Sequence, residues 1–210
     1  MKQRDRETRE RVLRVAAQQF ADRGFKKVTV RDICKAARAN VAAVNYHFGD
    51  KSGLYREVLQ RAIEIVRATS EAARTAGEGR PAEERLRRYI HVSLCRVVTD
   101  GHANWISRLV HREIADPTPS FDALFDQGIR SRIDDLSGIV ADLLGCDVHD
   151  ERVARCVLSI HSQWVMFVPN PIASRLRSKF QLRNDSPDRV AEHIADFSLA
   201  GIRAVMSRSG

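Results

Sequence analysis

The stretch that decides the fold is residues 29–51, TVRDICKAARANVAAVNYHFGDK. Its first part, T-x-x-D, is a capping box, which predicts that a short helix begins after Thr29 and ends near Ala36. Asn40 can cap a second short helix, over residues 41–48. Two short capped helices joined by a tight turn are typical of a helix-turn-helix, whose second helix can lie in a DNA major groove.

Helical spacing leaves a set of residues on the outer side of these two helices. The small side chains of Ala42 and Ala43 allow close approach to bases, and an alanine methyl can meet a thymine methyl. Asn45 can form two hydrogen bonds with adenine. Arg31 could reach a guanine edge or a phosphate. The polar groups that suit phosphate oxygens are those of Thr29, Tyr46, His47 and Lys51.

Positive charge is concentrated in the same part of the chain. Residues 1–51 hold 13 Lys/Arg and 6 Asp/Glu, whereas the other 159 of the 210 residues hold 22 and 21. A basic segment attached to a nearly neutral body is the pattern expected of a protein that binds a polyanion. A solvated, charge-rich first helix would explain the charge alone equally well.

The rest of the chain is expected to be helical, because apolar residues recur at spacings of three and four and no strand-like alternation persists. We predict an all-α fold of nine or ten helices: an N-terminal three-helix domain over residues 1–50, then a larger helical domain over residues 51–210. The clearest expected helices are 4–23, ended by Gly24, a long one from Lys51 to about Ala76, and a final one after Ser186-Pro187.

Residues 8–60 resemble the DNA-binding domain of the TetR family of repressors. The resemblance is carried by T-V-R-D-I, by A-A-x-x-x-V-A-A-V, by Tyr46-His47-Phe48, and by Lys51 followed by Leu54-Tyr55. It implies an operator-binding homodimer. The family's phosphate-contacting positions correspond to Thr29, Tyr46, His47 and Lys51, and its base-reading positions to Arg31, Val41, Ala42, Ala43 and Asn45.

Two residues depart from the family's pattern. Arg38 stands where the turn usually has glycine, so either the turn relaxes or Arg38 adopts a left-handed conformation at a cost of roughly 1 kcal/mol or more. Asn45 replaces a frequent tyrosine, which puts inference of base preference from the family in doubt.

The second domain resembles the subgroup of TetR-like proteins typified by CecR, through the stretch R-E-I-A-D-P-T-P-S-F that begins at Arg112 and, loosely, through residues 159–167. That resemblance implies a small-molecule sensor. Candidate pocket residues are aromatic or cationic groups in neighbouring helices, although such aromatics are more often core than pocket. They are His102, Trp105, Arg108, Leu109, Arg112, Phe121 and Phe125.

Two late helices carry apolar stripes at seven-residue spacing. One consists of Val153, Val157, Ile160, Trp164 and Phe167, and the other of Val190, Ile194, Phe197, Gly201 and Ala204. Such stripes suit a four-helix bundle between two subunits, and the TetR family dimerises through its last two helices. Packing of both stripes into the core of one subunit is the nearly equal alternative.

Other classes of function have less support. The four cysteines form no CxxC pair and no histidine spacing completes a zinc set, so we expect no metal, no disulfide and no cofactor. No stretch predicts a signal or a membrane span, so we expect a cytoplasmic protein. The sequence contains no catalytic motif that would support an all-α enzyme or carrier. The remaining candidates are a ligand-responsive repressor, an activator and an architectural DNA binder.

Overall fold

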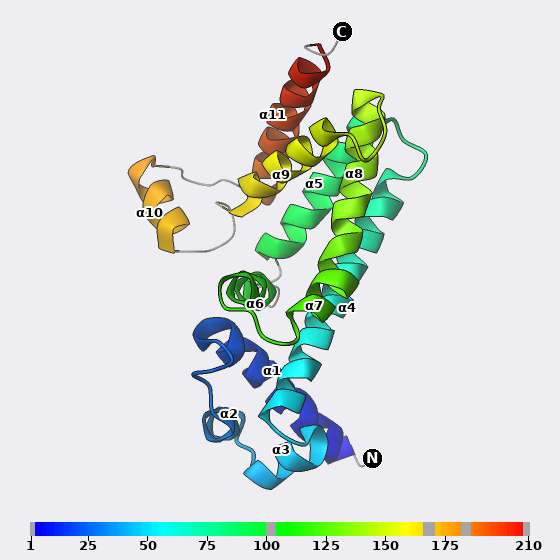
Figure 1. Ribbon diagram of the computed structural model, residues 1–210. Helices are drawn as coiled ribbons and strands as arrows, with labels where there is room; N and C mark the ends of the chain where they lie inside the picture. The colour runs from blue at the N-terminus through cyan, green and yellow to red at the C-terminus, as the bar shows by residue number, and fades with distance from the viewer. Residues whose placement is uncertain (1–2, 100–103, 166–170, 182–185, 208–210) are drawn as a thin grey trace. The chain divides into compact units, whose positions relative to one another are not determined.

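The computed structural model describes residues 3–99, 104–165, 171–181 and 186–207, and these residues form helices and no strand, as predicted (Figure 1). The helices are more numerous than expected, because short helices lie between the long ones. They are α1 Gln3–Arg23, α2 Val30–Ala37, α3 Val41–Phe48, α4 Lys51–Gly77, α5 Ala82–Thr99, α6 Asn104–Ala115, α7 Phe121–Leu124, the π-helical turn η1 Phe125–Ile129, α8 Arg130–Leu144, α9 Glu151–Val165, α10 Pro171–Lys179 and α11 Pro187–Ser207.

The helix ends follow from local chemistry. Gly24, with φ 80°, ends α1 and donates its N–H to the Phe20 carbonyl at 2.9 Å. Gly145, with φ 65°, ends α8 in the left-handed conformation. Ser186 Oγ accepts the Arg189 N–H at the start of α11. These residues satisfy backbone groups that a helix end leaves without a partner. No helix of the described segments is both long and apolar enough to cross a membrane.

The chain forms two compact units, and the first is discontinuous. It comprises residues 1–65 together with 105–128, whereas the second comprises 66–104 and 129–210. Helix α4 therefore has residues in both units, and α6 belongs with the N-terminal helices. The functional boundary that we predict, between a DNA-binding domain over residues 1–50 and a second domain over residues 51–210, stays a prediction.

The core of the first unit is built where α1, α2 and α3 pack against one another. Val12, Ala16 and Phe20 line one side of α1, and Ile33 and Val44 face inward from α2 and α3; all five are fully buried. This burial accounts for the stability of two helices of eight residues each, which would be marginal alone.

The second unit has its own apolar core, formed by α5, α8, α9, α11 and the end of α4. The largest residues buried there include Tyr89, Leu94, Leu136 and Ile194. The Tyr89 hydroxyl donates to the Arg132 carbonyl at 2.9 Å, which satisfies its one buried polar group.

The two apolar stripes have different locations. The described part of the α9 stripe, Val153, Val157 and Ile160, is buried in the core of the chain itself, which is the second of the two alternatives stated for it. Trp164 and Phe167 lie where no side chain is described. On α11, Val190 and Ile194 are also buried, whereas Phe197 is 65% exposed and Gly201 and Ala204 are exposed.

Candidate DNA-binding surface

The start of α2 is fixed by the predicted capping box. The Asp32 N–H donates to Thr29 Oγ1 at 3.1 Å, and the Thr29 N–H donates to Asp32 Oδ2 at 3.2 Å. These hydrogen bonds from Thr29, assisted by Arg23 and Lys35, lower the pKa of the Asp32 carboxyl. Thr29 is exposed, so its hydroxyl can still donate to an oxygen outside the protein.

The turn between α2 and α3 depends on Arg38. Its φ of 49° and ψ of 47° are left-handed, so the residue that replaces glycine adopts the strained conformation itself. The turn is held by the Ala39 N–H, which donates to the Cys34 carbonyl at 3.0 Å. A second bond comes from α1: Arg11 Nε donates to the Ala37 carbonyl at 2.7 Å. That support from Arg11 has no signature in the sequence.

Helix α3 begins at the predicted cap, where Asn40 Oδ1 accepts the Ala43 N–H at 2.7 Å. Its outward residues are the ones expected: Tyr46 is 76% exposed, Val41 is 42% exposed, and Ala42 and Asn45 are exposed. Arg31 on α2 is exposed too, whereas Ala43 and His47 are half-buried. The predicted set thus lies on α2, α3 and the residues that flank them.

Lys51 has a neighbour that the sequence did not indicate. Its Nζ lies 4.4 Å from the centroid of the Phe25 ring, so the ammonium is attracted to the ring face. The Phe25 ring lies 4.8 Å from that of Tyr55, which in turn contacts Phe20 at 4.9 Å. Lys51 is therefore positioned by an aromatic cluster.

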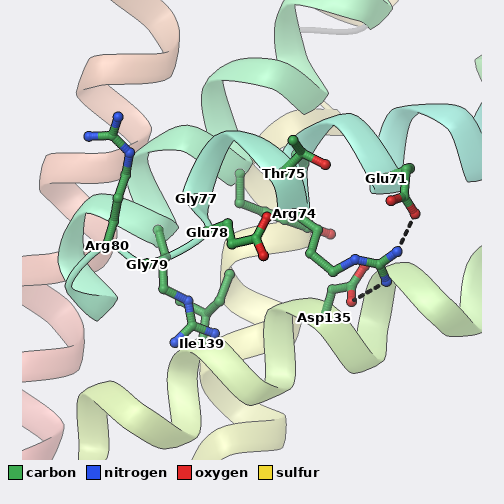
Figure 2. A pocket seen from close by; sticks show the side chains of 12 residues that line it. Glu71, Arg74, Thr75, Gly77, Glu78, Gly79, Arg80, Asp135 and Ile139 are labelled. Carbon is green, nitrogen blue, oxygen red and sulfur yellow. Dashed lines mark hydrogen bonds and ion pairs between the residues drawn. The ribbon is translucent and has the colours of Figure 1, made fainter.

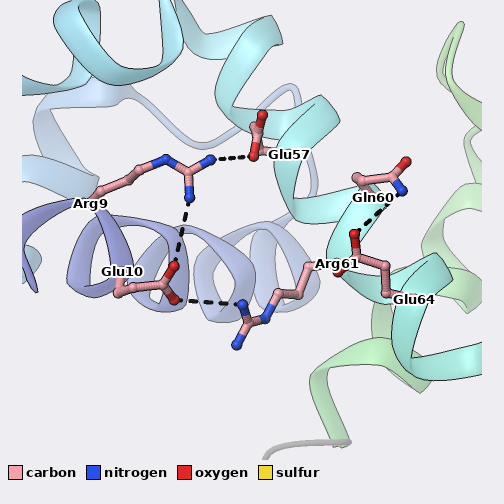
Figure 3. Close-up of polar contacts among 6 residues, drawn as sticks. All are labelled: Arg9, Glu10, Glu57, Gln60, Arg61 and Glu64. Atoms are coloured by element: carbon pink, nitrogen blue, oxygen red, sulfur yellow. Dashed lines mark hydrogen bonds and ion pairs between the residues drawn. The ribbon is translucent and has the colours of Figure 1, made fainter. Parts of the chain in front are cut away.

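Helices α1 and α4 are joined by a surface network of charged residues (Figure 3). Arg9 Nη2 lies 2.6 Å from Glu57 Oε2, and Glu10 accepts contacts of 3.6 Å from both Arg9 and Arg61. Arg9 also lies over the Phe48 ring, with its Cζ 5.3 Å from the centroid. Exposed ion pairs contribute little stability, so this network adds little to the free energy of unfolding.

Helix α6 carries most of the predicted ligand-binding residues. Trp105 and Leu109 are 6% and 1% exposed, and Phe121 and Phe125 are half-buried with ring centroids 6.3 Å apart. His102 lies outside the described residues.

The two arginines of α6 are bound to the end of α1. Arg108 Nη2 donates to Gln18 Oε1 at 3.0 Å and its Nε lies 3.1 Å from Asp22 Oδ1. Arg112 donates from Nε to the Ala21 carbonyl at 2.7 Å and from Nη2 to the Asp22 carbonyl. The guanidinium groups that we expected to meet an anionic ligand thus satisfy groups at the end of a helix.

A buried carboxylate connects α6 with α4. Glu113, 1% exposed, accepts the hydroxyl of Tyr55, and its other oxygen accepts the N–H and hydroxyl of Thr118 at 3.1 and 3.0 Å. Burial, followed by the Glu113 carboxylate, raises the pKa of Tyr55 above its usual value. The segment around Thr118 belongs to the first unit, and these hydrogen bonds through Glu113 join it to α4 within that unit.

A hollow of about 600 Å³ lies in the second unit, where the end of α4 meets α5 and α8 (Figure 2). Its lining is charged: Arg74 pairs with Glu71 and lies 3.9 Å from Asp135. Burial raises the pKa of the Asp135 carboxyl. None of the predicted ligand-binding residues lines this hollow.

Comparison with known proteins gives two matches along the chain. Residues 12–58 match the family of bacterial regulatory proteins named after TetR, and residues 82–202 match the C-terminal domain of the HTH-type transcriptional dual regulator CecR. CecR of Shigella flexneri is 26% identical over 156 residues, which are 70% of this chain and 69% of that protein.

Solved structures share the fold. A TetR-family regulatory protein from Rhodococcus RHA1 has a TM-score of 0.70 at 18% identity, over 93% of this chain and 96% of that one. The TetR-family regulator PfmR from Thermus thermophilus has a TM-score of 0.61 at 19% identity, over 91% and 97% of the two chains. With a capped helix-turn-helix at one end and the CecR-type domain over more than half of its length, this chain belongs to the TetR family of DNA-binding transcriptional regulators.

Proposed function

We propose that this protein is a ligand-responsive repressor that binds a palindromic operator as a homodimer and is released by a small-molecule effector. The observation that carries the proposal is the outer face of α3, where Asn45 and the 76% exposed Tyr46 have no role in the core. Exposed aromatic and amide groups beside basic residues are of the kinds that bind DNA phosphates and base edges. One such helix covers only a few base pairs, so a symmetric pair is needed for a specific site.

The roles proposed for neighbouring residues predict different kinds of mutant. Asn45→Ala should cost about 1–3 kcal/mol at one or two base positions and relax selectivity there. Lys51→Ala should weaken binding to operator and random DNA alike, and lower the slope of log affinity against log salt by about one unit. The site selected from a random DNA pool by the wild-type protein supplies the operator, and fluorescence anisotropy over a salt series measures both variants.

The selected site also tests the symmetry of binding. An inverted repeat with half-sites about one DNA turn apart, or a multiple of that, is the expected result.

Equal losses on operator and random DNA for Asn45→Ala would remove Asn45 from base recognition. Mapping the site relative to a promoter separates repression from activation and from an architectural role.

The effector is proposed to act through α6. Arg108 and Arg112 hold this helix against the end of α1, and Trp105 and the ring pair Phe121–Phe125 supply apolar surface in the same unit. An anionic effector that draws Arg108 away from Asp22 would bind the state without the Arg108–Asp22 contact better than the state with it. Only such a difference in affinity can shift the equilibrium between the two states. A tenfold loss of operator affinity requires about 1.4 kcal/mol of coupling.

Substitution of Trp105 tests this route. Because Trp105 is 6% exposed, alanine would leave a cavity, and Trp105→Phe is the better variant. We expect it to retain operator affinity within about threefold and to need on the order of tenfold more effector for release, a coupling loss of typical size. Ile114→Ala, at a 62% exposed position of the same helix, is the matched control. The measurement is release from the operator by compounds that dissociate the wild-type complex; an unchanged response of Trp105→Phe would place the effector elsewhere.

A further inference from the structure

Three side chains of the kinds that bind metals meet on the second unit. His91 and Cys95 are one turn apart on α5, and Asp188 lies in the first turn of α11. One ligand atom from each lies within 4.8 Å of the other two. The cysteine and histidine spacings of the sequence predict no metal site, since none of them completes a zinc set. Asp188 stands 93 positions beyond Cys95, and only the packing of α11 on α5 brings the two residues together.

The distances are close to those of a coordinated ion. Cys95 Sγ lies 3.7 Å from His91 Nε2 and 3.8 Å from Asp188 Oδ1, and the latter two atoms are 2.8 Å apart. Around a tetrahedral zinc ion, sulfur and nitrogen ligands are separated by about 3.6 Å, and nitrogen and oxygen ligands by about 3.3 Å. Only the His91–Asp188 pair must open, by roughly half an ångström on this geometry. The His91 and Asp188 side chains are 46% and 73% exposed, so neither is locked in place by packing.

A catalytic arrangement of the same three residue types would look different. In a Cys-His-Asp triad the thiol and the carboxylate contact opposite nitrogens of the imidazole ring, because the carboxylate orients the base that activates the thiol. Here both Cys95 Sγ and Asp188 Oδ1 lie near the same nitrogen, Nε2 of His91. Three donor atoms around one point form a ligand set and not a proton relay.

The surroundings leave room for a fourth ligand. A hollow of about 340 Å³ is lined by His91, Asp188 and Glu192, the last being one turn after Asp188 on α11. A water or the Glu192 carboxylate could complete the set. The two arginines at the wall have their charge offset by carboxylates: Arg87 Nη1 is 2.7 Å from Asp196 Oδ1, and Arg88 Nη2 is 3.7 Å from Glu84 Oε1.

We propose that His91, Cys95 and Asp188 bind a divalent transition-metal ion of the zinc class. A thiolate and an imidazole select such ions over magnesium and calcium, which prefer oxygen ligands alone. The site joins the start of α11 to α5, so a bound ion would stabilise the packing of these two helices. It does not involve the DNA-binding residues, and its test is independent of the proposed function.

Cobalt(II) is the probe, because it replaces zinc and absorbs visible light in tetrahedral sites. The reduced full-length protein should bind one Co²⁺ per chain, show a thiolate-to-cobalt charge-transfer band, and lose both signals when Zn²⁺ is added. Cys95→Ser should abolish the charge-transfer band. Because loss of a residue that merely orients a ligand weakens metal binding 10–100-fold, His91→Gln and Asp188→Asn should each weaken Zn²⁺ binding on the order of 100-fold.

Cys146→Ser is the matched control, since Cys146, like Cys95, is a half-buried cysteine but lies outside the triplet. It should bind Co²⁺ with the wild-type spectrum. Circular dichroism of each variant checks that its total helical content equals that of the wild-type protein. A wild-type protein without the charge-transfer band, or a band that survives in Cys95→Ser, would overturn the proposal, and equal Zn²⁺ affinity in all variants would show an adventitious ion only.

Discussion

Gly53→Ala is expected to lower the free energy of unfolding of the first unit by about 2–3 kcal/mol, the usual cost of forcing extra atoms into a packed site. A Cβ at residue 53 would lie 1.9 Å from the Phe48 carbonyl oxygen and 3.1 Å from its carbon. These are backbone atoms at the last residue of α3, so they cannot rotate aside. The methyl group must therefore push α3 away from the start of α4.

The same displacement should affect DNA binding, because Asp50 and Gly53 hold the junction that sets the angle of α3. The Gly53 N–H donates to Asp50 Oδ1 at 2.6 Å, which caps α4. We expect operator affinity to fall on the order of tenfold, or about 1.4 kcal/mol. Urea unfolding followed by circular dichroism measures the stability, and anisotropy measures the affinity.

Gly138→Ala is the control for this prediction. Gly138 lies inside α8, and nothing is within 4 Å of a Cβ built there. Alanine at an open helical site should stabilise the protein by about 0.5–1 kcal/mol, so the two substitutions are expected to have opposite signs. A Gly53→Ala protein as stable as wild type would mean that the connection between α3 and α4 is looser than described.

Phe197→Glu is expected to separate the proposed homodimer into monomers. Phe197 is 65% exposed on α11 and is flanked by the small exposed residues Ala200, Gly201 and Ala204, which allow close approach of a second helix. A two-fold interface contains each residue twice. The substitution therefore places two carboxylates in the interface. If each costs about 2 kcal/mol, the dissociation constant of the dimer should rise on the order of 1,000-fold.

Because Phe197 is exposed in one chain, the variant should fold normally, and circular dichroism checks this. Sedimentation velocity at micromolar concentration should then detect a monomer, and affinity for a full operator should fall toward that for one half-site. Phe180→Glu is the control, because Phe180 is 64% exposed but lies beyond the end of α10. A Phe197→Glu protein that sediments as a dimer would assign the interface to another face.

Local features were predictable from the sequence, because a cap or a helix end depends on a few neighbouring residues. Thr29 with Asp32, Asn40 and Gly24 all act where the pattern placed them. The same is true of the exposed residues of α3, since helical spacing alone separates Val44 from Asn45.

Long-range features were not predictable, because periodicity shows which face of a helix is apolar but not what covers it. The stripe at Val153, Val157 and Ile160 was correct as an apolar face, yet it faces the chain's own core. Likewise, nothing in the spacing of Arg108 and Arg112 indicates that they bind the end of α1, about 90 residues earlier. Only the packing of α6 in the first unit brings these groups together.

The discontinuous first unit has a consequence for engineering. A fragment that ended at Ile65 would leave the buried Tyr55 hydroxyl without Glu113 and the Ala21 carbonyl without Arg112, since both partners come from α6. A chimera that exchanges only the first sixty residues with another regulator would place foreign residues opposite Glu113 and Arg112. Operator specificity should therefore be transplanted by grafting the outward side chains of α3 onto an otherwise intact unit, and not by exchanging a contiguous piece of the gene.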